Sequence, residues 1–279
     1  MTLTNLPPLS IASLLRQHNL TPKKSLGQNF LIDDHMLHSI VESAEVGKED
    51  AVLEIGPGLG SLTRHLALAA KQVTAVELDQ NLIPILRDVL EGFDNVRVIH
   101  GDMLKLDPLA LMGSAPYGVI ANIPYYITSA LIRHLLESGN RPVRLVFTMQ
   151  EEVAERICAR DGKHSLLSLS VHVYGAPRVM MKIPAGAFSP VPKVDSATLR
   201  LDLFDQPIIP QERMAEFFRL AKAGFSQKRK NLRNSLSGGL NCSKEEAEHL
   251  LAAAQIDATR RAETLTLTEW ARLTAMYHA

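Results

Sequence analysis

The sequence has few cysteines, no excess of charge of either sign and no long apolar run. Its two cysteines, Cys158 and Cys242, lie far apart and form no CxxC pair, which argues against a disulfide framework and a zinc site. Lys plus Arg and Asp plus Glu both number 30, so overall charge indicates no acidic or basic partner. We therefore expect a globular protein of the reducing cytoplasm.

Segments for membrane insertion or export are also missing. No apolar run approaches the roughly 20 residues that span a bilayer, and the first residues have no basic start ahead of their short apolar run. The ten histidines show no metal-ligand pairing, so no metal site is predicted. We expect neither secretion nor a membrane span, and 279 residues allow one large domain with or without a small one.

Apolar runs typical of strands alternate with segments at helical spacing. Strands are predicted at 51–55, 72–77, 96–102, 117–122 and 144–150. Helices are predicted at 61–70, 80–93 and 129–139. This alternation predicts a parallel sheet covered on both faces, with a ligand site at the carboxyl ends of its strands.

The chain changes character farther along. Residues 165–175 and 196–204 alternate like an antiparallel pair, joined by the proline-rich stretch 182–196, which is long enough to reach the mouth of a site. After 205–210 only helical segments follow, so we expect two domains, 1–205 and 206–279.

A glycine turn lies between the first predicted strand and helix. Gly56, Gly58 and Gly60 would let the backbone approach a ligand closely, and Glu77 ends the next strand, where an acid can accept hydrogen bonds from a ribose diol. The dinucleotide fingerprint requires glycine where this chain has Ser61, so the spacing after Glu54 fits S-adenosylmethionine better. A glycine turn needed only for close helix packing is the alternative.

Two more strand ends carry polar residues. Asp102 follows the third strand, where it could accept a hydrogen bond from an adenine amino group or simply serve in a turn. Asn122 follows the fourth, in the stretch NIPYYI. Its amide oxygen and the Pro124 carbonyl could hold the hydrogens of an exocyclic amine, while Tyr125 stacks on the base. The alternative is an Asn-Pro turn whose tyrosines pack on a helix.

Seven stretches together resemble the bacterial KsgA/RsmA type of ribosomal RNA adenine dimethyltransferase over essentially the whole chain. They are KKSLGQNFL (23–31), EIGPGLGSLT (54–63), VELD (76–79), GD (101–102), NIPYYI (122–127), FSPVPKVDSA (188–197) and FSQKRKNLRNSL (225–236). A departure is Tyr126, where many members have a second Asn. The resemblance implies a Rossmann-like methyltransferase sheet, mostly parallel with one antiparallel strand, in a catalytic domain (1–205) with an N-terminal arm and a small helical RNA-binding domain (206–279).

The resemblance also implies a substrate and a set of roles. It implies that S-adenosylmethionine serves in dimethylating N6 of two adjacent adenosines in a hairpin loop near the 3′ end of 16S rRNA, within the small ribosomal subunit or its precursor, and that the protein acts in subunit biogenesis as a monomer. The cofactor contacts it implies are Asn29, Leu31, Gly56, Glu77, Asp102 and Asn122. The amine would be held by Asn122, Pro124 and Tyr125, with Phe188 stacked on the opposite face of the adenine. Phe188 could instead be a simple core residue, but its place among prolines and a glycine on a connecting loop favours a position near the surface.

A basic stretch lies in the predicted second domain. Residues 221–236 carry five basic side chains and no acid, and with Lys23 and Lys24 they could contact phosphates, although such runs are usually solvated helix faces.

Two rival functions compete with the methylation of ribosomal RNA. One rival is an N6-adenine DNA or protein-glutamine methyltransferase, against which Ile123 and the 188–197 stretch argue. The other is an RNA-binding assembly or transcription factor without turnover, against which the intact Glu77, Asp102 and Asn122 argue.

Overall fold

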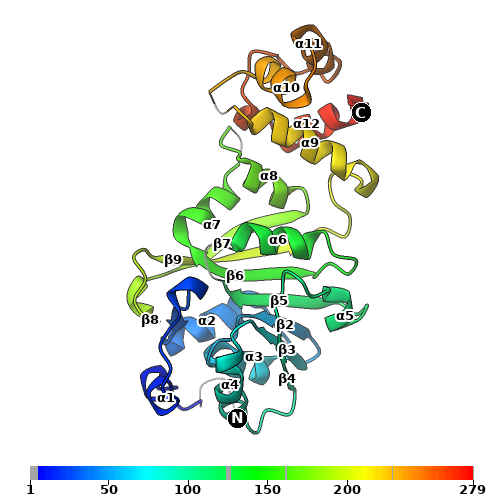
Figure 1. Cartoon of the computed structure of the whole chain (residues 1–279). Coiled ribbons are helices and arrows are strands. Elements are labelled where there is room, and N and C mark those ends of the chain that lie inside the picture. The colour runs from blue at the N-terminus through cyan, green and yellow to red at the C-terminus, as the bar shows by residue number, and fades with distance from the viewer. Residues whose placement is uncertain (1–5, 124–126, 161, 228, 279) are drawn as a thin grey trace. The chain divides into compact units, whose positions relative to one another are not determined.

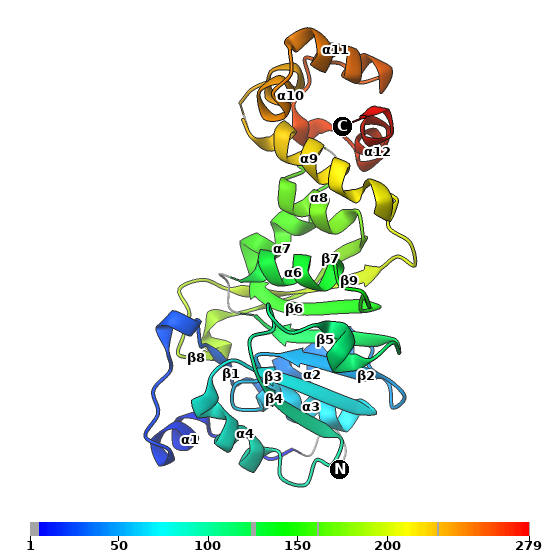
Figure 2. The ribbon, with the colours of Figure 1, turned by 45° about the vertical axis from the view of Figure 1, so that its right-hand side comes forward.

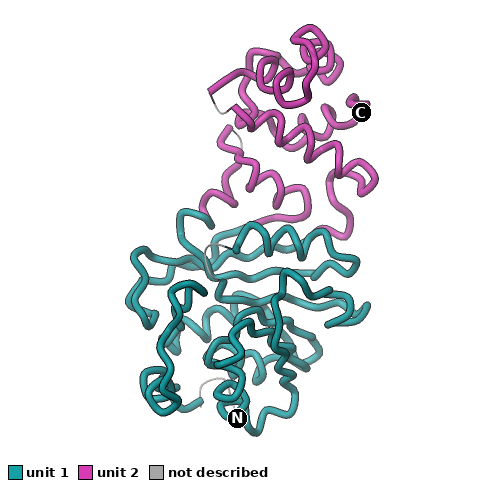
Figure 3. The backbone as a smooth tube through the Cα atoms, viewed as in Figure 1, with its two compact units in different colours: residues 1–154, 178–203 teal, residues 155–177, 204–279 magenta. Residues whose placement is uncertain are grey.

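The computed structural model describes residues 6–123, 127–160, 162–227 and 229–278. Two compact units are present (Figure 3), one formed by Met1–Ala154 with Arg178–Leu203 and the other by Glu155–Pro177 with Phe204–Ala279. The division at 203/204 lies near the predicted boundary after 205. However, residues 155–177, which we expected in the first domain, group with the C-terminal helices.

A seven-stranded sheet runs in the order β4-β3-β2-β5-β6-β9-β7 (Figure 1). Its strands are β2 Ala51–Ile55, β3 Gln72–Glu77, β4 Val96–His100, β5 Tyr117–Asn122, β6 Arg144–Gln150, β7 Gly175–Ile183 and β9 Ser196–Leu203. The strands β2 to β6 pair in parallel, and β9 pairs antiparallel with β6. This arrangement confirms the predicted fold class, and all five predicted parallel strands are present.

A helix follows each of the parallel strands β2 to β6, and another lies just before β2 in the chain. In chain order they are α2 Asp34–Ala44, α3 Ser61–Ala69, α4 Ile83–Val89 after the 3-10 turn η3 Gln80–Leu82, α5 Pro108–Met112, α6 Thr128–Leu136 and α7 Glu151–Cys158. The predicted helix 80–93 is thus shorter than expected, and Pro84 lies in its first turn, where a missing N–H costs no hydrogen bond.

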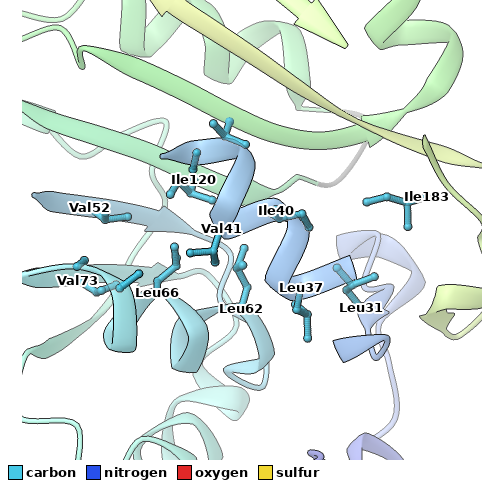
Figure 4. Packing of buried hydrophobic residues seen from close by; sticks show 14 of the residues in the cluster. Leu31, Leu37, Ile40, Val41, Val52, Leu62, Leu66, Val73, Ile120 and Ile183 are labelled. Atoms are coloured by element: carbon cyan, nitrogen blue, oxygen red, sulfur yellow. The ribbon is translucent and has the colours of Figure 1, made fainter. Parts of the chain in front are cut away.

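The apolar faces of α2 and α3 cover one face of the sheet (Figure 4). Leu37, Ile40 and Val41 of α2 meet Leu62 and Leu66 of α3. Beneath them lie side chains from neighbouring strands, Val52, Val73, Ile120 and Val146. This buried layer fixes the strand ends from which the predicted site residues project.

The segment 165–175 is not the predicted strand. It holds the helix α8 Leu166–His172, so its expected antiparallel pairing with 196–204 is wrong. A capping box explains the difference, because the Ser165 hydroxyl accepts from the Ser168 amide while the Ser168 hydroxyl accepts from the Ser165 amide. β9 lies instead between β6 and β7 in the sheet.

An N-terminal arm precedes the sheet. It comprises α1 Ile11–Gln17, the turn η2 Lys24–Leu26 and β1 Phe30–Leu31. β1 pairs with β8 Phe188–Ser189, which follows the turn η4 Ala185–Ala187 in the proline-rich stretch. α1 lies beside α4 in both views (Figures 1 and 2), with Ile11 and Leu15 packed against Ile85.

The second unit contains α8 and the helices that follow residue 204. These are α9 Met214–Phe225, α10 Leu232–Leu240, α11 Lys244–Ala253 and α12 Leu267–Met276, with short turns η5 Gln211–Arg213 and η6 Ala262–Thr264. α9 and α10 approach so closely that a Cβ on Gly239 would lie 2.5 Å from the Cα of Ala223. Trp270 is buried and stacks on Phe225.

Candidate functional site

A pocket opens where the parallel strands end. It contains about 1150 Å³ of empty space including its open mouth, enough for a nucleoside-sized ligand. The residues predicted for the site that the structure describes all line it, and these are Asn29, Leu31, Gly56, Glu77, Asp102, Asn122 and Phe188. Pro124 and Tyr125, and the unassigned Tyr126, lie outside the described residues.

The glycine turn brings backbone to the pocket wall. Gly56 and Gly58 have φ values of +71° and +60°, which side chains other than glycine rarely adopt. A Cβ on Gly58 would lie 3.0 Å from the Phe30 ring. The turn is therefore closed over by the arm, and glycine at position 58 is required by both conformation and space.

Glu77 joins this turn to the end of β3. Its Oε2 accepts from the Gly58 amide at 2.9 Å, and its Oε1 accepts from the Asp79 amide at 2.8 Å. Burial raises its pKa, although these amides lower it. Each carboxylate oxygen keeps a further lone pair, so the group can hold the turn and still accept from a ribose diol.

Asn122 is oriented by the arm. Its Nδ2 donates to the Asn29 carbonyl oxygen at 3.1 Å, and a carbonyl can only accept, so the nitrogen must face Asn29. The amide oxygen then forms the other end of the group and is the atom that can accept from a substrate amine. The Asn29 side chain in turn donates to the Gly27 carbonyl at 3.3 Å.

Asp102 is a turn residue that also lines the pocket. Its Oδ1 accepts from the Leu104 amide at 3.1 Å, and its Oδ2 lies 3.6 Å from the Lys105 amine. The turn role that we considered as an alternative is therefore real. A ligand contact is compatible with it and stays a prediction.

Phe188 is not near the surface as we expected. It is 2% exposed and belongs to the apolar cluster of α2 and α3. The expectation is wrong because β8 pairs with β1, opposite Leu31, and turns the proline-rich stretch back into the core. Phe188 still lines the pocket, so its contact with a base stays a prediction.

Sequence reasoning missed two acidic groups near the site. Glu54 was noted only as a neighbour of the turn, yet its carboxyl group is buried and lines the pocket. Asp79 was left without a role, although its place in VELD was a signal. Its carboxylate accepts from the Lys23 amine at 2.7 Å, so that amine is engaged within the protein rather than extending a phosphate-binding surface.

Comparison with known proteins identifies the family. The family model described as ribosomal RNA adenine dimethylase matches residues 19–277. The chain belongs to the ribosomal RNA adenine dimethylase family. Two curated relatives are named ribosomal RNA small subunit methyltransferase A. The one from Dehalococcoides mccartyi is 44% identical over 95% of this chain and 91% of its own, and the one from Bacillus licheniformis is 43% identical over 95% and 94%.

Solved structures agree with the family. The 23S rRNA methyltransferase ErmE is similar with a TM-score of 0.72 and 30% identity, over 89% of this chain and 99% of its own. A dimethyladenosine transferase from Plasmodium falciparum has a TM-score of 0.75 and 26% identity, over 86% and 94%. The predicted family, enzyme class and Rossmann-like sheet are thereby confirmed, and membership implies S-adenosylmethionine as co-substrate.

Two other features are missing from the described part of the chain. None of its helices is long and apolar enough to cross a membrane. Nor do the described His, Cys, Asp and Glu side chains form a group of three or more placed to hold a metal ion.

Proposed function

We propose that this protein dimethylates N6 of two adjacent adenosines in a hairpin loop near the 3′ end of 16S rRNA, with S-adenosylmethionine as methyl donor. The observation that carries the proposal is that the described residues predicted from four strand ends and the arm all line one pocket. The small-subunit relatives support the choice of RNA. The partner would be the small ribosomal subunit or its precursor, met in the cytoplasm, and we expect the protein to act as a monomer.

The pocket fits the cofactor in size and chemistry. Glu77 would accept from the ribose hydroxyls while the glycine turn, fixed by the same carboxylate, lets the ligand lie against backbone. Asp102 would accept from the adenine amino group. Asn29 and Leu31 would close the pocket from the arm. When bound, S-adenosylmethionine supplies an electrophilic methyl group.

Asn122 would prepare the nucleophile. An adenine amine is a poor nucleophile because its lone pair is delocalised into the ring, and an acceptor that holds one of its hydrogens favours a pyramidal nitrogen. The Asn122 oxygen is placed for this because its Nδ2 is committed to the Asn29 carbonyl. The Pro124 carbonyl is the predicted second acceptor. After the N–C bond forms, the nitrogen is acidic and loses its proton to solvent, so positioning carries most of the catalysis and no strong base is needed.

The base must leave its stack to reach this point. A loop base costs least to extrude, and an aromatic pair would hold it once extruded. Tyr125 is the predicted wall on one side and Phe188 on the other. Phe188 is buried in the apolar cluster opposite Leu31. The contact would therefore be made by the part of its ring that faces the pocket.

Methylation of undermethylated small subunits tests the proposal. Purified protein and labelled S-adenosylmethionine should label two adjacent adenosines at N6, mapped by nuclease digestion and mass spectrometry. Duplex DNA and a glutamine-containing protein substrate serve as competitors for the rival methyltransferase classes. Unlabelled subunits would overturn the proposal, as would labelling confined to a competitor. A non-catalytic assembly role would be favoured if an Asn122→Ala variant still supported every cellular function.

A further inference from the structure

The N-terminal arm is fastened beside the pocket by one buried carboxylate. Lys23 Nζ donates to Asp79 Oδ1 at 2.7 Å, and Gln28 Nε2 donates to Asp79 Oδ2 at 3.0 Å. The Asp79 side chain is 4% exposed and that of Lys23 is 40% exposed. A further bond, from the Lys23 amide to Gln28 Oε1 at 2.7 Å, ties the two arm residues to each other.

Asp79 is also hydrogen-bonded to a residue of the pocket wall. The Asp79 amide donates to Glu77 Oε1, and Glu77 Oε2 accepts from the Gly58 amide. Asp79 also caps η3, because its Oδ1 accepts from the Asn81 amide at 3.1 Å. A continuous series of hydrogen bonds therefore runs from the arm through Asp79 to the carboxylate predicted to hold the ribose.

The part of the arm held in this way forms a wall of the pocket. Residues 26–31 line it, and the Asn29 carbonyl oxygen accepts a hydrogen bond from the Asn122 side chain. Residues 30–31 are fixed separately by the β1–β8 pair. Earlier in the arm, the Pro7 carbonyl accepts from Arg64 at 2.8 Å. Between these attachments, the bonds of Lys23 and Gln28 to the Asp79 carboxylate attach residues 23–29 just after the end of β3.

We propose that Asp79 is a positioning residue that latches residues 23–29 over the pocket and so holds the bound nucleoside cofactor in place. It acts through Glu77, Lys23 and Gln28 and does not itself line the pocket. The identity of the cofactor rests on the proposed function. Breaking the latch should speed cofactor escape without removing a group that contacts the cofactor.

Substitution of the latch followed by binding of S-adenosylhomocysteine tests this role. Asp79→Asn keeps the cap on η3 but loses the charge and one of the two acceptors. We expect calorimetric affinity to fall about tenfold, mainly through faster dissociation. Lys23→Met, which leaves Asp79 intact and changes no residue of the pocket wall, should weaken binding in the same direction. Lys71→Met, which removes an exposed lysine paired with Glu49, is the matched control.

Two readouts separate a latch from a merely structural role. Adding Lys23→Met to Asp79→Asn should cause little further loss of affinity, because both substitutions break the same contact between Lys23 and Asp79. Hydrogen exchange at amides 24–31 in the ligand complex should be faster in Asp79→Asn and unchanged in Lys71→Met. If the wild-type protein binds the ligand and both latch variants bind it with the same affinity, the latch alone is overturned, as it would be by fully additive losses. Absence of binding by the wild-type protein would overturn the proposed cofactor as well.

Discussion

Glu54 is the second-last residue of β2, just before the glycine turn, and is the most deeply buried acid of the pocket wall. It is 1% exposed, and its Oε2 has no hydrogen-bond partner among the described residues. Burial raises its pKa to about 8, and the nearby Glu77 carboxylate adds to the effect. The group is therefore mostly protonated at neutral pH.

This burial predicts a pH dependence of stability. The folded pKa lies above the ordinary value of 4.5, so the contribution of Glu54 is fully present below pH 4.5 and is lost as pH rises toward 8. We expect the free energy of unfolding to fall by about 1 kcal/mol per pH unit across this window. Glu54→Gln should have a shallower dependence in urea unfolding at pH 5, 6.5 and 8. Parallel curves for the two proteins would contradict the assignment.

Asn122 has two functions that substitution can separate. Asn122→Ala removes both the acceptor for the amine and the donor to Asn29, and we expect kcat to fall about 100- to 1000-fold. Asn122→Asp keeps an acceptor but sets a carboxylate against the Asn29 carbonyl, so it should also lose most of its activity. Methyl transfer to small subunits measures kcat, and calorimetry should show that cofactor affinity changes much less. Full activity of Asn122→Asp would show that the bond to Asn29 is not required.

At the residue scale, the sequence predicts which residues gather but not how they bond. The strand ends were placed by periodicity, because parallel strands deliver their carboxyl ends to one edge. The bond from Asn122 to Asn29 joins residues 93 positions apart, and the burial of Phe188 depends on the pairing of β1 with β8. Neither follows from local pattern, because both arise only when the arm folds back onto the sheet.

At the element scale, long periodic segments were predicted well and short ambiguous ones were not. The parallel strands β2 to β6 lie within two residues of their predicted bounds. The segment 165–175 alternates like a strand, yet the Ser165 capping box begins a helix there. The strand β7 was missed because Pro177 and exposed residues interrupt its pattern. Local capping and sheet position decide such cases more than alternation does.

One buried arginine ties the end of α2 to the sheet. Arg200 of β9, with a side chain 5% exposed, donates to the Ser43 carbonyl at 2.9 Å and pairs with Glu45 at 2.7 Å. It also pairs with Asp202 at 3.0 Å, and these partners raise its pKa, with Glu45 the largest cause. The end of α2 is thereby fixed against β9.

Loss of this arginine should destabilise the first unit. We expect Arg200→Met to lower the free energy of unfolding by about 1–3 kcal/mol, because the end of α2 loses its buried charged attachment, although Glu45 keeps its pairing with Arg144. Arg178→Met is the matched control, since its side chain is 56% exposed and pairs with the same Asp202. Urea unfolding of both variants provides the measurement. An equal loss in the two would show that burial of Arg200 adds nothing.

At the scale of the whole molecule, the change to helices after 205 predicts a second domain, but nothing in the local sequence groups 155–177 with those helices as the compact units do. Those residues lie between β6 and β9 in the chain, and their membership depends on backbone bonds across long separations. The His164 amide donates to Glu263 at 3.2 Å, and the Phe204 amide donates to Tyr174 at 2.9 Å. Such pairings leave no local trace in composition or periodicity.

The second unit also carries the basic stretch, and its role in RNA binding can be tested by charge removal. Lys222, Arg229 and Lys230 are exposed, whereas Arg233 pairs with Glu248 at 3.3 Å. Neutralising the three exposed residues to Gln should weaken binding to small subunits. It should also reduce the slope of log affinity against log salt by about 2, because a protein that makes fewer phosphate contacts releases fewer counterions on binding.

The control for this experiment removes the same charge elsewhere on the same unit. Lys244, Arg261 and Arg272 are also exposed, and their change to Gln should leave affinity and salt slope close to wild type. Binding is measured by filter retention of labelled subunits between 50 and 200 mM salt, about the range over which phosphate contacts show their dependence. Cofactor affinity should be unchanged in both variants. Equal weakening in both would mean that overall charge, rather than the 221–236 stretch, attracts the RNA.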